Sequence, residues 1–208
     1  MGCCGKSRRQ VNKLDPKLTD LSETGRLHFF YHSPSSAYPV RDVRNEQGHG
    51  YKTEPYIELG PDHRGAENYC FECNPMNIRG FLKGREKYLF LFTTCRNEGL
   101  KKYCGKVYIV GYIKKVCAEL RPRGFYAVIG PVKLYSFDDA YRLGISASDN
   151  NPRQMKKRCD AKRTRGILHH FKGRDNILNC CRNELERLKK DLPEIIRKEQ
   201  LRSAGGFA

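Results

Sequence analysis

The chain of 208 residues contains no tryptophan, no long apolar run and none of the short motifs that identify common enzyme classes. No stretch approaches the about 18 apolar residues that a membrane-spanning helix needs, so we expect no membrane partner. There is no Gly-x-Ser-x-Gly, no dinucleotide-binding glycine pattern and no His-Glu-x-x-His. No motif therefore fixes a nucleophile, a base and an orienting residue together, and no activity as an enzyme is assigned.

Positive charge is the strongest compositional feature. The chain has 40 Lys and Arg against 23 Asp and Glu, a formal charge of +17, and a pI near 9.6. Solubility alone does not require this excess, so the leading interpretation is a polyanionic partner, and a merely charged surface is the alternative. The hydrophobic content of 38 % is typical of a globular protein. With no secretory signal peptide visible, we expect a cytoplasmic protein with reduced thiols.

Three apolar runs rich in strand-forming residues occupy 88–94, 106–116 and 125–135. Gly111 lies where a β-bulge or a close approach of two backbones is expected. Gly130-Pro131 cannot lie inside a central strand and predicts a sharp bend. The runs therefore predict a small, strongly curved sheet or a partly closed barrel.

The part of the chain before these runs divides into an arm and the start of the core. Residues 1–24 are expected to form a basic N-terminal arm, and the core extends over 25–150. It begins with a short strand at 27–32 and continues into a long loop at 37–77, which is rich in Pro, Gly, Asn and acidic residues. A loop of this length inside a compact domain is usually functional or stapled by a metal ion.

The part after the runs is predicted to be helical. Ser136 is a helix N-cap signal for a short helix over 136–143. Residues 151–208 form a basic segment followed by a helix from about 175 to 201, whose apolar residues follow helical spacing and give one stripe that packs on the core. Pro193 predicts a kink or a new start in that helix.

The segment 153–174 is strongly basic, with one acid, Asp160. Such a run repels itself in water, so it is either disordered or held on something negative. We therefore predict that its lysines and arginines contact phosphates. These residues are Arg153, Lys156, Lys157, Arg158, Lys162, Arg163, Arg165, Lys172 and Arg174.

Aromatic and basic residues are interspersed through the block 87–137 that holds the three runs. Aromatic faces beside Lys and Arg are typical of sites that stack unpaired bases, although ordinary core packing is the alternative. Tyr31, Tyr103 and Tyr112 are the candidate pocket residues. His28 and His32 lie four apart on a predicted strand and so share a face, which makes them weak catalytic candidates.

Four cysteines are candidate metal ligands. Cys70 and Cys73 have the spacing with which two thiolates on a turn bind one ion, and Cys95 and Cys104 lie at the ends of the loop between two predicted strands. Together they predict a zinc site. Eight residues separate Cys95 from Cys104, so this second pair lacks the two-residue spacing. Buried or free thiols at Cys70 and Cys73 are an equal alternative, and an iron-sulfur cluster is left open as well.

The three runs resemble the strand order of the PUA-like superfamily, which includes EVE, ASCH and YTH domains and nucleotide-modification-associated domains. The likeness lies in Tyr88-Leu-Phe-Leu-Phe-Thr, Gly105-Lys-Val-Tyr-Ile-Val-Gly-Tyr-Ile and Phe125-Tyr-Ala-Val-Ile-Gly-Pro-Val. The resemblance implies an α+β fold with a small β-barrel and peripheral helices, which binds RNA or a modified base.

Charge, aromatic residues and resemblance together predict a nucleic-acid-binding protein that prefers RNA to DNA. The barrel face would supply selectivity, and the basic segment would supply affinity through release of counterions from phosphates. Two alternatives are an enzyme that modifies or cleaves nucleic acid and a structural subunit of a ribonucleoprotein particle. The sequence does not indicate the oligomeric state.

Overall fold

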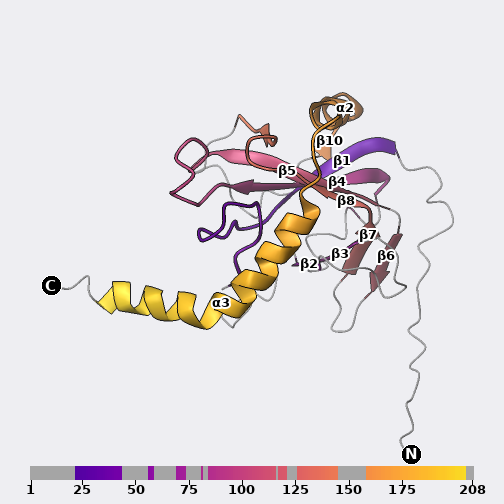
Figure 1. Cartoon of the computed structure of the whole chain (residues 1–208). Coiled ribbons are helices and arrows are strands. Elements are labelled where there is room, and N and C mark those ends of the chain that lie inside the picture. Colours follow the sequence, from indigo (N-terminus) through magenta and orange to yellow (C-terminus); the bar gives the residue numbers. More distant parts are fainter. Residues whose placement is uncertain are drawn as a thin grey trace, which may run out of the picture.

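The computed structural model describes residues 22–43, 56–58, 69–73, 81, 84–115, 117–120, 126–144 and 158–204. Its main sheet has six strands, in which β1 and β4 are parallel and the other pairs are antiparallel. Across the sheet lie β10 (Arg158–Cys159), β1 (Ser22–Phe29), β4 (Glu86–Thr94), β5 (Val107–Lys114) and β8 (Val132–Leu134), and β9 (Tyr141–Arg142) also pairs with β5. The fold is α+β with an open sheet (Figure 1), and the expected partly closed barrel is not confirmed.

A second sheet has four antiparallel strands. Their order is β2 (Tyr56–Glu58), β3 (Tyr69–Cys73), β7 (Tyr126–Gly130) and β6 (Cys117–Leu120). The segment 37–77 was expected to be one loop, and it contains β2 and β3. These strands are too short to show a hydrophobic period, so their pairing with β7 and with each other was not visible in the sequence.

The bend at Gly130-Pro131 is confirmed. β7 ends at Gly130 in the second sheet, and β8 begins at Val132 in the first sheet. Proline has no N–H to donate to a ladder, so the chain leaves one sheet at this dipeptide and enters the other. The third predicted strand is thus two strands in two sheets.

The bulge predicted at Gly111 is also confirmed. Leu91 pairs with Gly111, but the next residue pairs with Ile109, so Val110 is the extra residue of β5. A Cβ atom on Gly111 would lie 2.2 Å from the carbonyl oxygen of Lys133, so only glycine allows β8 to approach this closely. The bulge shifts the alternation of β5, which places Val110 in the core on one side of the sheet and Tyr112 on the other.

One face of the main sheet packs against α3 (Leu178–Ala204). The predicted stripe of this helix is confirmed, because Leu178, Cys181, Leu185, Leu188 and Leu192 are all buried in one cluster with β4 and β5. The helix continues through Pro193, and Figure 1 shows that α3 changes direction in its second half, as a proline inside a helix predicts. None of the described helices is long and apolar enough to cross a membrane.

The opposite face of the sheet is covered by α2 (Ala161–His170), which lies above β1 in Figure 1. The basic segment that contains α2 was expected to be either disordered or held on a polyanion, and from Arg158 onward it is folded on the sheet. β10 pairs with β1, and the Asp160 carboxylate accepts a hydrogen bond of 2.7 Å from the backbone N–H of Arg163 as the helix N-cap. Thr164 and Ile167 are the buried residues of α2 and face the sheet. The N-cap and these two buried side chains hold α2 in place, although most of its other residues are basic.

The short helix expected over 136–143 is wrong. Residues 137–140 form a turn, and β9 follows directly. The Ser136 hydroxyl accepts a hydrogen bond of 3.1 Å from the backbone N–H of Asp139, which is the same contact that an N-cap makes. This local signal does not distinguish a turn from a helix, and the pairing of Tyr141 with Ile109 decides for the turn.

Candidate nucleic-acid interface

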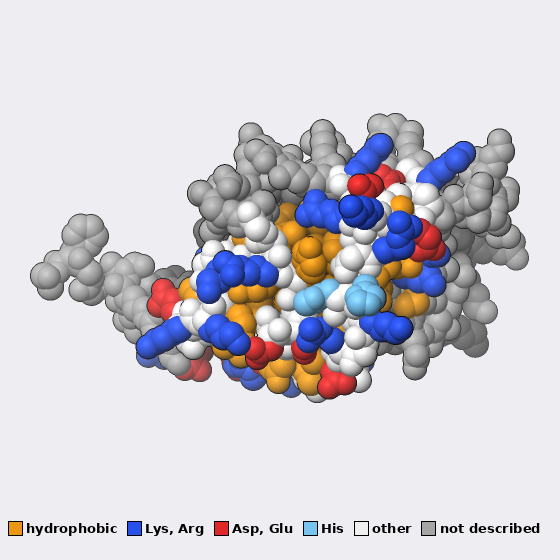
Figure 2. Space-filling model, turned by 90° about the horizontal axis from the view of Figure 1, so that it is seen from above, with side chains coloured by type: hydrophobic (Ala, Val, Ile, Leu, Met, Phe, Trp, Pro, Cys, Tyr) orange, Lys and Arg blue, Asp and Glu red, His pale blue; other side chains and the backbone are white. Residues whose placement is uncertain are grey.

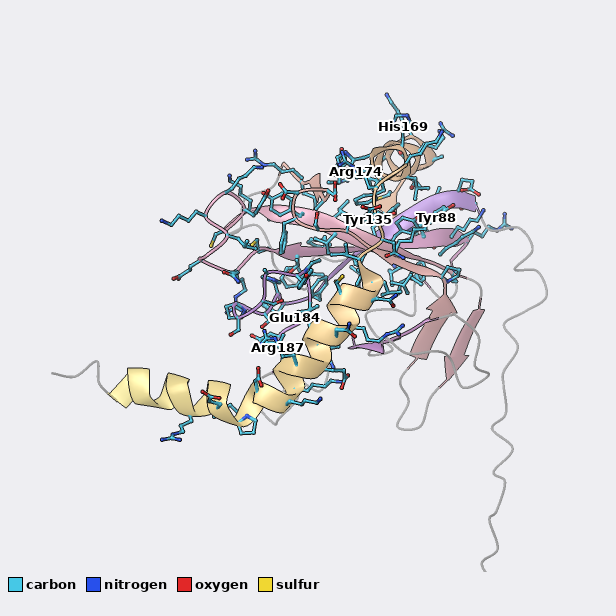
Figure 3. The ribbon with its side chains drawn as sticks, viewed as in Figure 1. Tyr88, Tyr135, His169, Arg174, Glu184 and Arg187 are labelled. Carbon is cyan, nitrogen blue, oxygen red and sulfur yellow. The ribbon has the colours of Figure 1, made fainter. Side chains whose placement is uncertain are left out.

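The outer face of α2 is a basic surface on a rigid support. Its inward positions are buried, and its outward positions carry exposed side chains without a single acid. Figure 3 shows His169 on the side of α2 that points away from the sheet. We call this the α2 surface and define it by the exposed residues Lys162, Arg163, Arg165, His169 and Lys172.

The four lysines and arginines of the α2 surface have no ion pair with any acid in the described part of the chain. Their two neighbours differ. Arg158 Nε lies 3.3 Å from Glu86 Oε1, and Arg174 Nη1 lies 2.5 Å from Asp139 Oδ1. Of the predicted phosphate contacts, Lys162, Arg163, Arg165 and Lys172 therefore have no charge-compensating acid within the described residues. Arg153, Lys156 and Lys157 lie outside the described residues.

Helix α3 gives a useful contrast, because two of its cations, Arg187 and Lys189, pair with acids on the same helix. Arg187 pairs with Glu184 and with Asp191, each at 2.8 Å, and Lys189 pairs with Glu186 at 3.0 Å. Figure 3 shows Glu184 and Arg187 beside each other on α3, on the opposite side of the sheet from α2. The exposed lysines and arginines of α2 thus differ from Arg187 and Lys189, which pair with acids on their own helix.

Hydrophobic side chains reach the surface beside α2. Figure 2 looks down on this face and shows them between two histidines and a surrounding set of lysines and arginines. Of the described histidines, His28 and His32 are buried, His169 is exposed and His170 is half-buried. The half-buried hydrophobic residues that pack on the core of this face are Tyr31, Tyr112, Tyr141 and Leu168. We call the three tyrosines the flanking tyrosines.

The C-terminal end of α2 is fixed by a compact set of contacts. Arg174 Nε donates to the carbonyl oxygen of His170 at 2.9 Å, and His170 Nε2 donates to the carbonyl oxygen of Asp139 at 3.0 Å. Phe171 stacks on Tyr135 with 4.0 Å between ring centroids and 3° between planes, and burial raises the pKa of Tyr135 above its ordinary value. The α2 surface is therefore held in place before any partner arrives.

The N-terminal approach to α2 is fixed by a buried ion pair. Arg26 Nη2 of β1 lies 2.9 Å from Glu86 Oε1 of β4, and both side chains are buried. Arg158 of β10 contacts the same carboxylate oxygen from the exposed side. Glu86 thus links three adjacent strands immediately before the chain enters α2.

The three predicted pocket tyrosines do not come together. Tyr31 and Tyr112 pack on the α2 side of the sheet, but Tyr103 packs on the α3 side, where its ring stacks on Phe137. The Tyr103 hydroxyl also donates a hydrogen bond to Asp138. Tyr103 is therefore a structural residue of the β4–β5 hairpin, and the α2 face holds the other two.

His28 and His32 are both buried, and neither ring reaches the surface. The backbone N–H of Arg96 donates to His32 Nδ1 at 3.0 Å, so Nε2 carries the proton that it donates to the carbonyl oxygen of Tyr38 at 2.9 Å. Burial lowers the pKa of His32 to about 4 and that of His28 to about 3, so both rings are neutral near pH 7. His32 thus links the segment around Tyr38 to the segment after β4, and both of its ring nitrogens are occupied by these structural hydrogen bonds.

The four cysteines predicted to bind zinc belong to two different parts of the fold. Cys70 and Cys73 lie within a single strand, β3, instead of on a turn. Cys95 is buried and Cys104 half-buried at the β4–β5 hairpin, which Figure 1 shows at the opposite end of the molecule from β3. Among the described residues no group of three or more His, Cys, Asp or Glu could hold a metal ion, and bound zinc or an iron-sulfur cluster stays a prediction.

Sequence reasoning missed Tyr141 and Gly166. Tyr141 was assigned to a helix, and only its pairing with Ile109 in β9 places it beside His170, with ring centroids 5.3 Å apart. Gly166 lies within the basic segment 153–174 and was not singled out there. A glycine inside a helix lowers its stability, so such a residue usually has a packing or functional role.

No family model, no curated protein and no solved structure matches the chain.

Proposed function

We propose that the protein binds single-stranded nucleic acid, with RNA preferred to DNA, through the α2 surface and the flanking tyrosines. The observation that carries this proposal is a set of four cations, on α2 and the turn after it, that have no ion pair among the described residues and lie beside half-buried aromatic side chains. Cations that neutralise phosphates release counterions and supply affinity without regard to sequence. Four such contacts on a single strand would give a salt slope of about −2.8, from about −0.7 per phosphate.

The flanking tyrosines favour a single strand over a duplex. Tyrosine rings stack on bases whose faces are open, and a duplex hides those faces inside its stack. Tyr112 belongs to the main sheet and reaches this side only because of the bulge at Gly111, so the sheet supplies the selective part of the surface. The finer expectation of a PUA-like core remains part of this proposal and adds the preference for RNA.

The test compares oligonucleotides of one sequence as single-stranded RNA, single-stranded DNA and duplex RNA, with binding measured by fluorescence anisotropy. Single-stranded RNA should bind most tightly, and its affinity should fall steeply from low to physiological salt. Tighter binding of the duplex, or an affinity that does not change with salt, would contradict the proposal.

A further inference from the structure

Gly166 lies in the middle of the exposed face of α2, and nothing in the fold requires a glycine there. A Cβ atom added at Gly166 would meet no atom within 4 Å, and the residue is not among the described glycines with positive φ. Glycine inside a helix is less favourable than alanine, because it loses more backbone freedom on folding. The fold would therefore be more stable with alanine at this position.

The positions around Gly166 give the reason for its presence. On a helix surface the neighbours of a residue lie three and four positions away, and for Gly166 they are Lys162, Arg163, His169 and His170. His170 Nε2 already donates to the carbonyl oxygen of Asp139, so the nitrogen donors left around Gly166 are those of Lys162, Arg163 and His169. Helical side chains lean toward the N-terminus, so the ring of His169 extends over the turn that contains Gly166. The result is a stretch of bare backbone surrounded by donors.

We infer that a phosphate group of the bound strand sits on the backbone at Gly166, held by Lys162, Arg163 and His169. The inference rests on the proposed function and adds to it a defined position on α2 at which the nucleic acid is bound. Any side chain at 166 would occupy the space of the phosphate and push it away from the three donors. Gly166 thus acts as a positioning residue. The helix is less stable than it would be with alanine at this position, but the phosphate can reach the backbone.

The test uses the full chain with Gly166→Ala and Gly166→Gln, and Asn183→Gln as the control. Asn183 is an exposed position on α3, where glutamine also favours the helix. The melting temperature and the affinity for a single-stranded oligoribonucleotide are measured for each protein. One arm uses a strand with a 5′-hydroxyl and another a strand with a 5′-phosphate, which tells an internal phosphodiester from a terminal phosphate.

Both substitutions at Gly166 should raise the melting temperature, and both should lower the affinity. Gly166→Gln should lower it by about tenfold, which corresponds to the loss of one charge-assisted hydrogen bond. Gly166→Ala should lower it less, and Asn183→Gln should leave it unchanged. Opposite changes in stability and affinity are a result that a purely structural glycine would not give.

Two failures are distinguishable. If the wild-type protein binds no single strand, the proposed function fails. A second outcome is that the wild type binds, that Lys162→Gln with Arg165→Gln weakens binding, and that Gly166→Gln binds as tightly as the wild type. In that case phosphate binding at Gly166 is overturned and the proposed function stands.

Discussion

The positive charge of the α2 surface can be tested quantitatively by removing equal charge from two helices. One variant carries Lys162→Gln and Arg165→Gln on α2, and its matched control carries Arg187→Gln and Lys189→Gln on α3. Both lower the net charge by two. The α2 pair has no ion pair among the described residues, whereas the α3 pair is bound to acids on its own helix at 2.8 to 3.0 Å.

The size of the effect follows from counterion release. Each phosphate neutralised on a single strand contributes about −0.7 to the slope of log affinity against log salt, so losing two contacts should reduce the slope by about 1.4. Between about 50 and 200 mM salt the wild type should then lose about sevenfold more affinity than the α2 variant. The slope of the α3 control should equal that of the wild type, because its charges are already compensated.

Anisotropy titrations of a single-stranded oligoribonucleotide at several salt concentrations measure these slopes, and thermal unfolding verifies that all three proteins are folded. Equal slope changes in the two variants would refute the reasoning, because they would show that binding follows the total charge of +17 and not the α2 surface.

Three further predictions concern the fold that supports this surface. Gly111→Ala should lower the free energy of unfolding by at least about 2 kcal/mol, because the new Cβ would lie 2.2 Å from the Lys133 carbonyl oxygen, and unchanged urea unfolding would contradict this. The pKa values of about 3 for His28 and about 4 for His32, below the usual 6.5, mean that the unfolded chain binds more protons. Stability should therefore be fully present above pH 6.5 and fall by up to about 2.7 kcal/mol per pH unit near pH 5, and a flat profile in urea unfolding at a series of pH values would argue against neutral buried rings. Leu188→Ala should cost about 2 to 5 kcal/mol, since this side chain is fully buried under the sheet, and a wild-type melting temperature would show that α3 does not pack as described.

The parts of the fold that were predictable have local signals. The strand runs, the bulge at Gly111, the bend at Gly130-Pro131 and the apolar stripe of α3 each follow from residue type and spacing over a few turns or pairs. The helix over 136–143 failed for the same reason, because its only evidence was a cap contact that a turn makes equally well.

The parts that were not predictable depend on long-range pairing. β1 lies parallel to β4, about 60 residues away, and β10 adds to β1 from the far end of the chain. The order of α2 depends on Asp160 as cap and on Ile167 as its fully buried inward residue, and the charge run around them obscures both. Charge density alone therefore predicted either disorder or contact with a polyanion, whereas tertiary contacts hold a helix there.

The sequence was enough to predict which residue types form the candidate site, but not where those residues lie in the fold. The sequence identified the cations, yet only the packing of α2 separates the exposed, uncompensated ones from Arg158 and Arg174, which pair with acids. Tyr112 and Tyr103 looked equivalent as aromatic residues beside lysines. The bulge in β5 and the hairpin geometry place them on opposite sides of the sheet.

The most direct test of the central claim is photochemical crosslinking of a bound single-stranded oligoribonucleotide, with the modified residues located by mass spectrometry. We predict crosslinks at Tyr31 and Tyr141 and within residues 158–174, on the α2 side of the main sheet. Crosslinks confined to α3 or to the second sheet would contradict the assignment of this face as the nucleic-acid interface.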